Sequence, residues 1–273
     1  MPASSIATFG VRPGSRTTMA RAVRAETTKL LTLRLCLNTM VGTVMLTVLL
    51  SWVLTNLIAA AHRAGRPEEA AGLLGGTAFL VILHYGQIGV ILLAAWSMHQ
   101  ESDSGSLRST LISLPQRSAV LAAKAVVVVA AAFITAVLSV FGSAGIRCVA
   151  IDCTAESSQI AATPQATSGV LWGVILYWVL IAVFTYALSV VLRSGLAAMG
   201  TVLAMALIVS TYLVNITPLA KFLPDQAGAQ LYQLPPPTPG DLGPATGGVV
   251  LAVWVAAALI TAHLLFRRQP VRR

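Results

Sequence analysis

Charged residues are scarce in this sequence. Only 10% of its 273 residues are charged and 56% are hydrophobic, whereas an ordinary soluble domain carries roughly 25% charged residues. Long stretches have no charge at all, and the arginines gather between these stretches and toward the two ends. A soluble fold could not bury so much apolar surface, so the composition indicates an integral membrane protein.

Acidic residues are few, with nine Asp and Glu in the chain, and all of them lie outside the apolar stretches. The sequence also has no H-E-x-x-H motif, no G-x-S-x-G motif and no pair of carboxylates within a stretch, which argues against an intramembrane protease or acyltransferase. We therefore expect a non-catalytic chain that binds no cofactor.

Lysine is rare as well, and none of Lys29, Lys124 and Lys221 follows a glycine. The chain thus lacks the G-x-x-x-x-G-K-[ST] loop that binds nucleotide phosphates.

The net charge of +9 raises the question of whether the protein binds nucleic acid. The basic residues flank apolar stretches and form no face interleaved with aromatics, so we expect no nucleic-acid partner.

Cysteine occurs three times, with no pair of CxxC motifs and no Cys/His cluster at metal-ligand spacing, which argues against a structural zinc. Cys36 opens an apolar stretch, where we expect an inert thiol. Cys148 and Cys153 share one short loop and could form a disulfide if that loop faces an oxidising compartment. The sequence leaves this pairing open.

The apolar stretches predict the fold. Each reaches the roughly 20 residues that an α-helix needs to cross a bilayer. The first is too long for the apolar region of a signal peptide, which has about 7–15 residues. We predict an all-α integral membrane protein with a disordered tail at 1–15 and a single transmembrane domain at 16–273. The expected spans are 37–61, 73–97, 121–146 (charge-free from 125), 170–192, 194–216 and 247–266.

The distribution of basic residues predicts the orientation. If the N-terminus is cytoplasmic, only Arg63, Arg66, Arg147 and Lys221 of the 18 basic residues lie outside. The positive-inside rule therefore favours cytoplasmic termini at both ends. The outer segments are then 62–72, 147–169 and 217–246.

Two polar residues fall in the middle of the second predicted span. His84 and Gln87 are three positions apart and so lie on one helix face. Polar groups at this depth usually face the interior of a helix bundle. They could line a cavity or form hydrogen bonds between helices, and the sequence leaves both roles open.

Two inner segments have amphipathic character. Residues 16–35 mix basic residues with loosely clustered apolar ones, which fits a helix along the inner interface or an ordinary basic flank. The inner segment 98–120 carries Leu107, Leu111 and Leu114 at helical spacing before Pro115. It predicts a short amphipathic helix that ends at the proline.

These two segments resemble the permease subunits of actinobacterial ABC-2 type ABC transporters. The first, with Glu26, Lys29, Leu30 and Arg34, is similar to the E-x-x-K-L pattern before the first span of that family. The second is similar to the loop pattern E-x-x-x-G-T-x-R-x-x-L-x-x-x-P-x-R-x-x-x-L-x-A-K, although Ser106 replaces the usual Thr and Gln116 stands where many members have a second Arg. The matching residues are Glu101, Gly105, Arg108, Leu111, Pro115, Arg117, Leu121, Ala123 and Lys124.

The resemblance implies a function and partners. It implies the permease subunit of an ATP-driven exporter in a bacterial plasma membrane, which works as a dimer with a second copy or a related subunit. ATP and magnesium would be bound by cytoplasmic ATPase subunits. Residues 16–35, with Glu26, Lys29 and Arg34, would form the connecting helix. The coupling helix at 101–117 would dock on the ATPase through Glu101, Asp103, Gly105, Arg108, Leu111, Pro115 and Arg117.

Alternatives remain at two levels. The loop helix could merely cap the bundle, because interfacial helices are common in polytopic proteins. The whole chain could instead be a secondary transporter or channel driven by an ion gradient, although such proteins usually carry carboxylates or broken helices in mid-membrane. The outer segment 217–246 is rich in proline and could be a solvated loop, or it could dip back toward the membrane as re-entrant helices, as the resemblance implies.

Overall fold

The computed structural model describes residues 15–65, 77–104, 117–150, 168–232 and 242–267. Within these ranges the regular structure is helical, with no strand. Six helices are long and apolar enough to cross a membrane, which confirms the prediction of an all-α, multi-pass membrane protein. By length and composition the candidate spans are Arg34–Ala61, Leu80–His99, Leu121–Arg147, Gly169–Leu192, Gly195–Leu213 and Pro244–Leu265.

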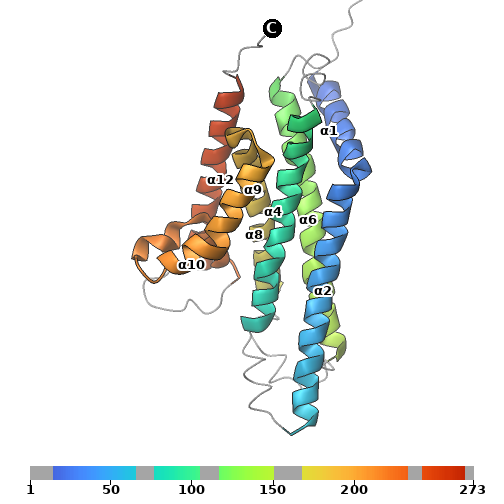
Figure 1. Ribbon diagram of the computed structural model, residues 1–273, viewed down its shortest axis with the longest axis vertical. Coiled ribbons are helices and arrows are strands. Elements are labelled where there is room, and N and C mark those ends of the chain that lie inside the picture. The colour runs from blue at the N-terminus through green and yellow to red at the C-terminus, as the bar shows by residue number, and fades with distance from the viewer. Residues whose placement is uncertain (1–14, 66–76, 105–116, 151–167, 233–241, 268–273) are drawn as a thin grey trace, which may run out of the picture.

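The long helices lie side by side along the long axis of the molecule (Figure 1). Both ends of the described chain, the end of α4 and the start of α6 lie at one end of this bundle, which we call the α1 end. α1 leads into α2 through a bend at Leu33, the single residue that separates the two helices. The long helices are α1 (Ser15–Thr32), α2 (Arg34–Arg63), α4 (Thr77–Ser104), α6 (Arg117–Ala150), α8 (Ser168–Leu192) and α12 (Pro244–Arg267).

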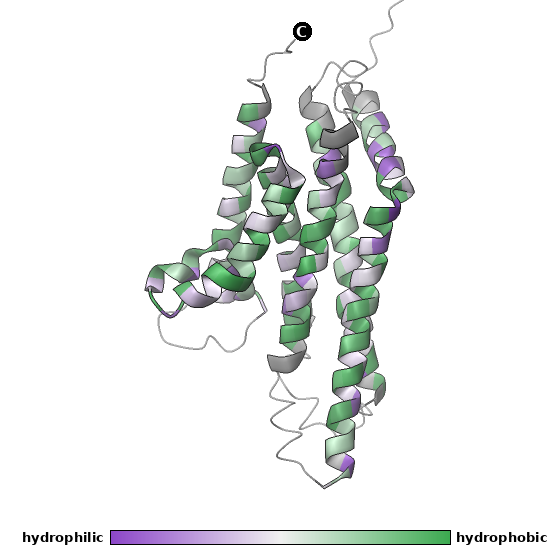
Figure 2. Cartoon of the chain, viewed as in Figure 1, coloured by the Kyte–Doolittle hydropathy of each residue, from purple (hydrophilic) through white to green (hydrophobic). Residues whose placement is uncertain are grey.

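α8 is the central helix of the bundle. It carries the highest share of buried residues among the six candidate spans, 72% against 17% for α12. Tyr177 and Trp178 are fully buried on it. Figure 2 shows that hydrophobic residues also cover the outside of the long helices, while hydrophilic ones gather on α1. A soluble protein rarely exposes so much apolar surface, but this is the surface that lipid chains cover.

The fifth candidate span is interrupted. α9 (Gly195–Ala204) passes into a π-helical turn, η3 (Met205–Val209), before α10 (Ser210–Leu213). Here the amide of Ser210 bonds to the carbonyl of Met205, five residues back. Such π-turns insert one residue into the helix and often occur at functional sites.

The chain after this span folds back against the bundle as η4 (Pro218–Phe222) and α11 (Pro224–Ala229). We call Pro218–Tyr232 the outer segment, because it belongs to the predicted outer segment 217–246. Three glycines allow it to approach α8 and α12 closely. A Cβ on Gly173 would lie 2.1 Å from the carbonyl oxygen of Leu231, one on Gly228 would meet the ring of Tyr177, and one on Gly247 would meet the carbonyl of Ala227. The solvated loop that was one alternative for 217–246 therefore does not describe Pro218–Tyr232. Residues 233–241 of the same predicted segment lie outside the described residues.

Candidate functional site

Of the residues predicted to contact an ATPase, Glu101, Asp103 and Arg117 lie at the α1 end of the bundle (Figure 1). Glu101 and Asp103 belong to the last turn of α4, so the first part of the expected 101–117 helix continues the second span rather than forming a helix of its own. Arg117 is the first residue of α6. Gly105, Arg108, Leu111 and Pro115 lie outside the described residues.

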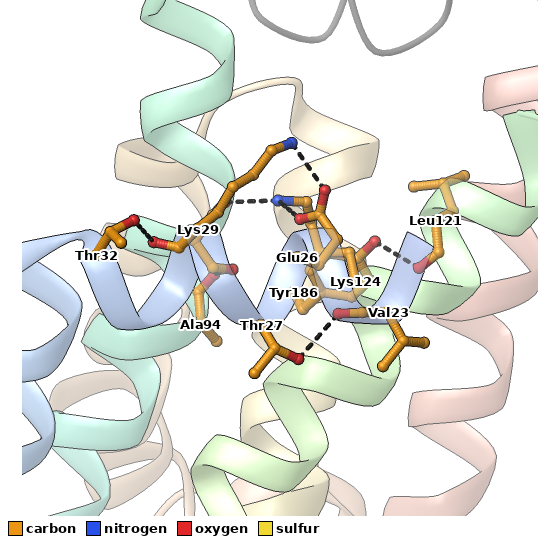
Figure 3. Close-up of polar contacts among 10 residues, drawn as sticks. Val23, Glu26, Thr27, Lys29, Thr32, Ala94, Leu121, Lys124 and Tyr186 are labelled. Carbon is orange, nitrogen blue, oxygen red and sulfur yellow. Dashed lines mark hydrogen bonds and ion pairs between the residues drawn. The ribbon is translucent and has the colours of Figure 1, made fainter. Parts of the chain in front are cut away.

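A buried ion cluster joins α1 to the neighbouring helices (Figure 3). The carboxylate of Glu26 accepts a hydrogen bond from Lys29, with 2.8 Å between Oε1 and Nζ, and its Oε2 lies 2.9 Å from Nζ of Lys124 in α6. Lys124 also donates to the carbonyl of Ser97 in α4 at 3.1 Å. The cluster thus ties α1, α4 and α6 together at one point.

The sequence places these charges in an apolar setting. Ala22, Glu26 and Leu30 recur every four residues and form the buried face of α1. From the sequence we noted only a loose apolar cluster in residues 16–35, so the burial of Glu26 was missed. The available signal was this i, i+4 spacing, together with Lys124 near the start of a long charge-free run. A cluster of buried apolar residues joins the same helices and α2: Leu30, Cys36, Leu93, Val127 and Ala131.

The lysines keep Glu26 ionised. Burial by itself raises the pKa of this carboxyl, but the charges and hydrogen bonds of Lys124 and Lys29 outweigh burial and leave the pKa below its ordinary value. The cluster can therefore act as an electrostatic clamp between helices. Arg34, the other residue expected in the connecting helix, is exposed and opens α2.

A second polar cluster lies between α4, α8 and the outer segment. Nδ1 of His84 is 2.9 Å from the hydroxyl of Tyr232, and its Nε2 is 3.2 Å from the amide nitrogen of Gln87. The hydroxyl of Tyr177 donates to Oε1 of Gln87. His84 and Gln87 thus share one helix face, as expected. They form hydrogen bonds to other elements, which was the alternative to lining a cavity.

The direction of these hydrogen bonds assigns the protonation of His84. The amide nitrogen of Gln87 can only donate, so Nε2 of His84 accepts and Nδ1 carries the proton that bonds to Tyr232. The same cluster holds two tyrosines that the sequence did not single out. Tyr177 and Tyr232 pack with ring centroids 5.5 Å apart.

A buried acid lies in the outer segment close to these tyrosines. Asp225 is fully buried, and its Oδ1 accepts a hydrogen bond of 2.6 Å from the hydroxyl of Ser210. The side-chain amide of Gln226 donates to its Oδ2 at 3.2 Å. Nothing in the sequence pattern indicated this site, because a single Asp in a proline-rich segment usually faces solvent.

The cysteines divide into two groups. Cys36 is fully buried with a free thiol, as expected. Cys148 lies in the last turns of α6 rather than in the expected loop, and Cys153 lies outside the described residues, so the pairing that the sequence leaves open stays open. In the described part of the chain, no three His, Cys, Asp or Glu residues come together in a way that could hold a metal ion.

No protein-family model matches the chain, and a search of curated proteins finds no match. The class that the fold defines is a multi-pass membrane protein, on the length and composition of its six candidate spans.

Proposed function

We propose that this chain is the membrane-spanning permease subunit of an ATP-driven exporter of the ABC-2 type. The observation that carries the proposal is the contact between Glu26 and Lys124. These residues belong to the two separate sequence patterns that resemble the permease family, one before the first span and one after the second. Two patterns that form a single structural unit are stronger support than two isolated matches.

The proposed mechanism uses this contact. The segment at 101–117 docks on a cytoplasmic ATPase subunit and moves when ATP closes the ATPase pair. Because 117 begins α6, the movement reaches α6 directly and reaches α1 through Lys124 and Glu26. The helices then rock to open a path outward. This chain performs no bond chemistry, and ATP with its magnesium is bound by the partner.

The charge at the α1 end supports a cytoplasmic location for it in a bacterial plasma membrane. Arg21, Arg24, Arg34 and Arg193 are exposed at this end, as the positive-inside rule requires of a cytoplasmic face. Cys148, toward the opposite end of α6, and Cys153 then face outward. A membrane-impermeant thiol reagent should label them in intact cells after reduction. Labelling confined to inverted vesicles would reverse the topology.

Purification of the full chain from its native membrane tests the function. We expect a protein with a nucleotide-binding phosphate loop to co-purify, and the reconstituted complex to hydrolyse ATP. Replacing the phosphate-loop lysine of that partner with alanine should abolish hydrolysis. The Glu26→Gln variant should leave hydrolysis in place but weaken its coupling to transport. A chain that transports in vesicles without any ATPase would refute the proposal.

An ion-gradient-driven transporter is the second candidate, and the buried carboxyl of Asp225 is the observation that favours it. Buried acids near the membrane often bind coupling protons. The two candidates differ in their energy source. Transport that stops with a proton ionophore and ignores ATP would favour the second.

A further inference from the structure

Asp225 holds the outer segment at a point where two helical elements meet. Its carboxyl bonds to Ser210, the first residue after the π-helical turn of the fifth span, while Asp225 itself lies in the first turn of α11. The outer segment therefore docks through a buried acid whose main partner is a neutral hydroxyl.

The titratable groups on or against the outer segment come from α4, α8 and the segment itself. α8 contributes Tyr177, and the segment itself contributes Tyr232. Both tyrosines lie close enough to Asp225 to interact electrostatically with its carboxylate. α4 contributes His84 through Tyr232. In η4, Lys221 lies over the ring of Phe222 at 5.5 Å. α12 contacts the segment through residues that include Gly247, Gly248, Leu251 and Trp254, and none of these four has a titratable side chain.

We propose that Asp225 is a proton-binding site, and that its neutral, protonated form is the one that holds the outer segment against α8 and α12. A protonated carboxyl can share its proton with Ser210 and needs no charge partner. An ionised carboxyl in the same place must give up its hydration, and neutral hydrogen bonds replace only part of it.

The electrostatics of the docked state agree with this assignment. Burial raises the pKa of Asp225, and the hydrogen bonds from Ser210, from the side chain and backbone of Gln226 and from the backbone of Asp225 offset only part of the rise. The contribution of Asp225 to docking is therefore complete below the ordinary pKa of an aspartate and is lost as the pH rises through the raised pKa. Between these two values Asp225 releases one proton on undocking, so its contribution to the docking constant falls about tenfold per pH unit and then levels off.

His84 sets an opposite requirement at the other end of the cluster. Its hydrogen bonds to Tyr232 and Gln87 use the neutral ring, because Nε2 must accept from Gln87. Protonation of His84 would therefore oppose docking at acid pH. The two groups together give docking an upper pH limit from Asp225 and a lower limit from His84.

Hydrogen–deuterium exchange of the full chain in lipid nanodiscs, over a series of pH values, tests the proposal without ATP or an ion gradient. After correction for intrinsic exchange rates, the ratio of amide protection in the outer segment of the unaltered protein to that in Asp225→Asn should fall about tenfold per pH unit above the ordinary aspartate range and then level off. Asp225→Asn mimics the neutral acid and retains His84, so its own profile should change with pH only through His84. A ratio that does not change with pH would overturn the proposal.

A second variant tests the site if Asp225→Asn does not fold. Ser210→Ala retains the acid but removes the donor that favours its ionised form, so the midpoint should move to higher pH. Thr211→Ala is the matched control, because Thr211 is the adjacent, exposed hydroxyl and bonds only to the carbonyl of Leu207. The carboxylic-acid C=O infrared band should titrate with the same midpoints. A band that titrates in the ordinary aspartate range, or no shift in Ser210→Ala, would contradict the assignment.

Discussion

Glu26 in α1 and Lys124 in α6 form an ion pair of 2.9 Å, with side chains only 5% and 8% exposed. Far apart in the sequence, they lie together because Ala22, Glu26 and Leu30 form the face of α1 that packs on the bundle. Removing one member of an ion pair this deeply buried is costly, since the remaining charge loses its buried partner.

Replacement of Glu26 by glutamine should therefore destabilise the chain. We expect a loss of about 3–5 kcal/mol in the free energy of unfolding, because the buried Lys124 would lose the carboxylate of Glu26 with which it pairs. SDS titration of the detergent-solubilised protein measures this loss. The double variant Glu26→Gln with Lys124→Met should recover part of it, since both charges are removed.

Lys29→Met is the matched control for that pair. Lys29 bonds to the same carboxylate, but its side chain is 37% exposed. Its removal should cost about 0.5 kcal/mol, as for other solvent-exposed pairs. If Lys29→Met and Glu26→Gln destabilise the protein equally, burial does not distinguish the two lysines and our account of the cluster fails.

The same cluster predicts a loss of stability in acid. Pairing with Lys124 and Lys29 leaves the pKa of Glu26 below its ordinary value of 4.5 in spite of burial. The stabilisation is complete above that ordinary value and is lost as the pH falls through the lowered pKa. Unfolding measured against pH should show this acid limb in the unaltered protein and a weaker limb in Glu26→Gln. Identical limbs would show that another group is responsible.

Two glycines of α8, four residues apart, should respond differently to alanine. A Cβ at Gly173 would lie 2.1 Å from the carbonyl oxygen of Leu231, whereas nothing lies within 4 Å of one at Gly169. Gly173→Ala should cost about 1–3 kcal/mol, because the backbone of the outer segment must move. Gly169→Ala should be neutral or stabilising by up to about 1 kcal/mol, the difference in helix propensity. Equal effects in thermal unfolding would place the outer segment elsewhere.

Charge reversal at Arg108 tests the proposed coupling segment. Loss of an interfacial charge contact costs about 2–5 kcal/mol, so Arg108→Glu should lower transport driven by ATP by at least about tenfold. The amount of protein in the membrane should not change. Arg108→Lys retains the charge and should keep much of the activity. Full transport by the Arg108→Glu variant would remove Arg108 from the interface.

The sequence alone determined the number and the approximate limits of the candidate spans. A bilayer-spanning helix must satisfy its backbone internally and expose apolar side chains to lipid, and both demands appear directly as apolar runs of sufficient length. The shared face of His84 and Gln87 was likewise fixed by helix periodicity, because residues three positions apart lie on one side.

Only the tertiary structure decided which polar residues are buried and what they contact. The burial of Glu26 depends on α1 packing against α6, and that of Asp225 depends on the chain turning back after a π-helical turn onto α8 and α12. The periodicity of one helix cannot reveal either site, because each partner comes from a distant part of the chain. Lys124, Ser210 and Tyr232 therefore acquire their roles from contacts that local sequence patterns do not encode.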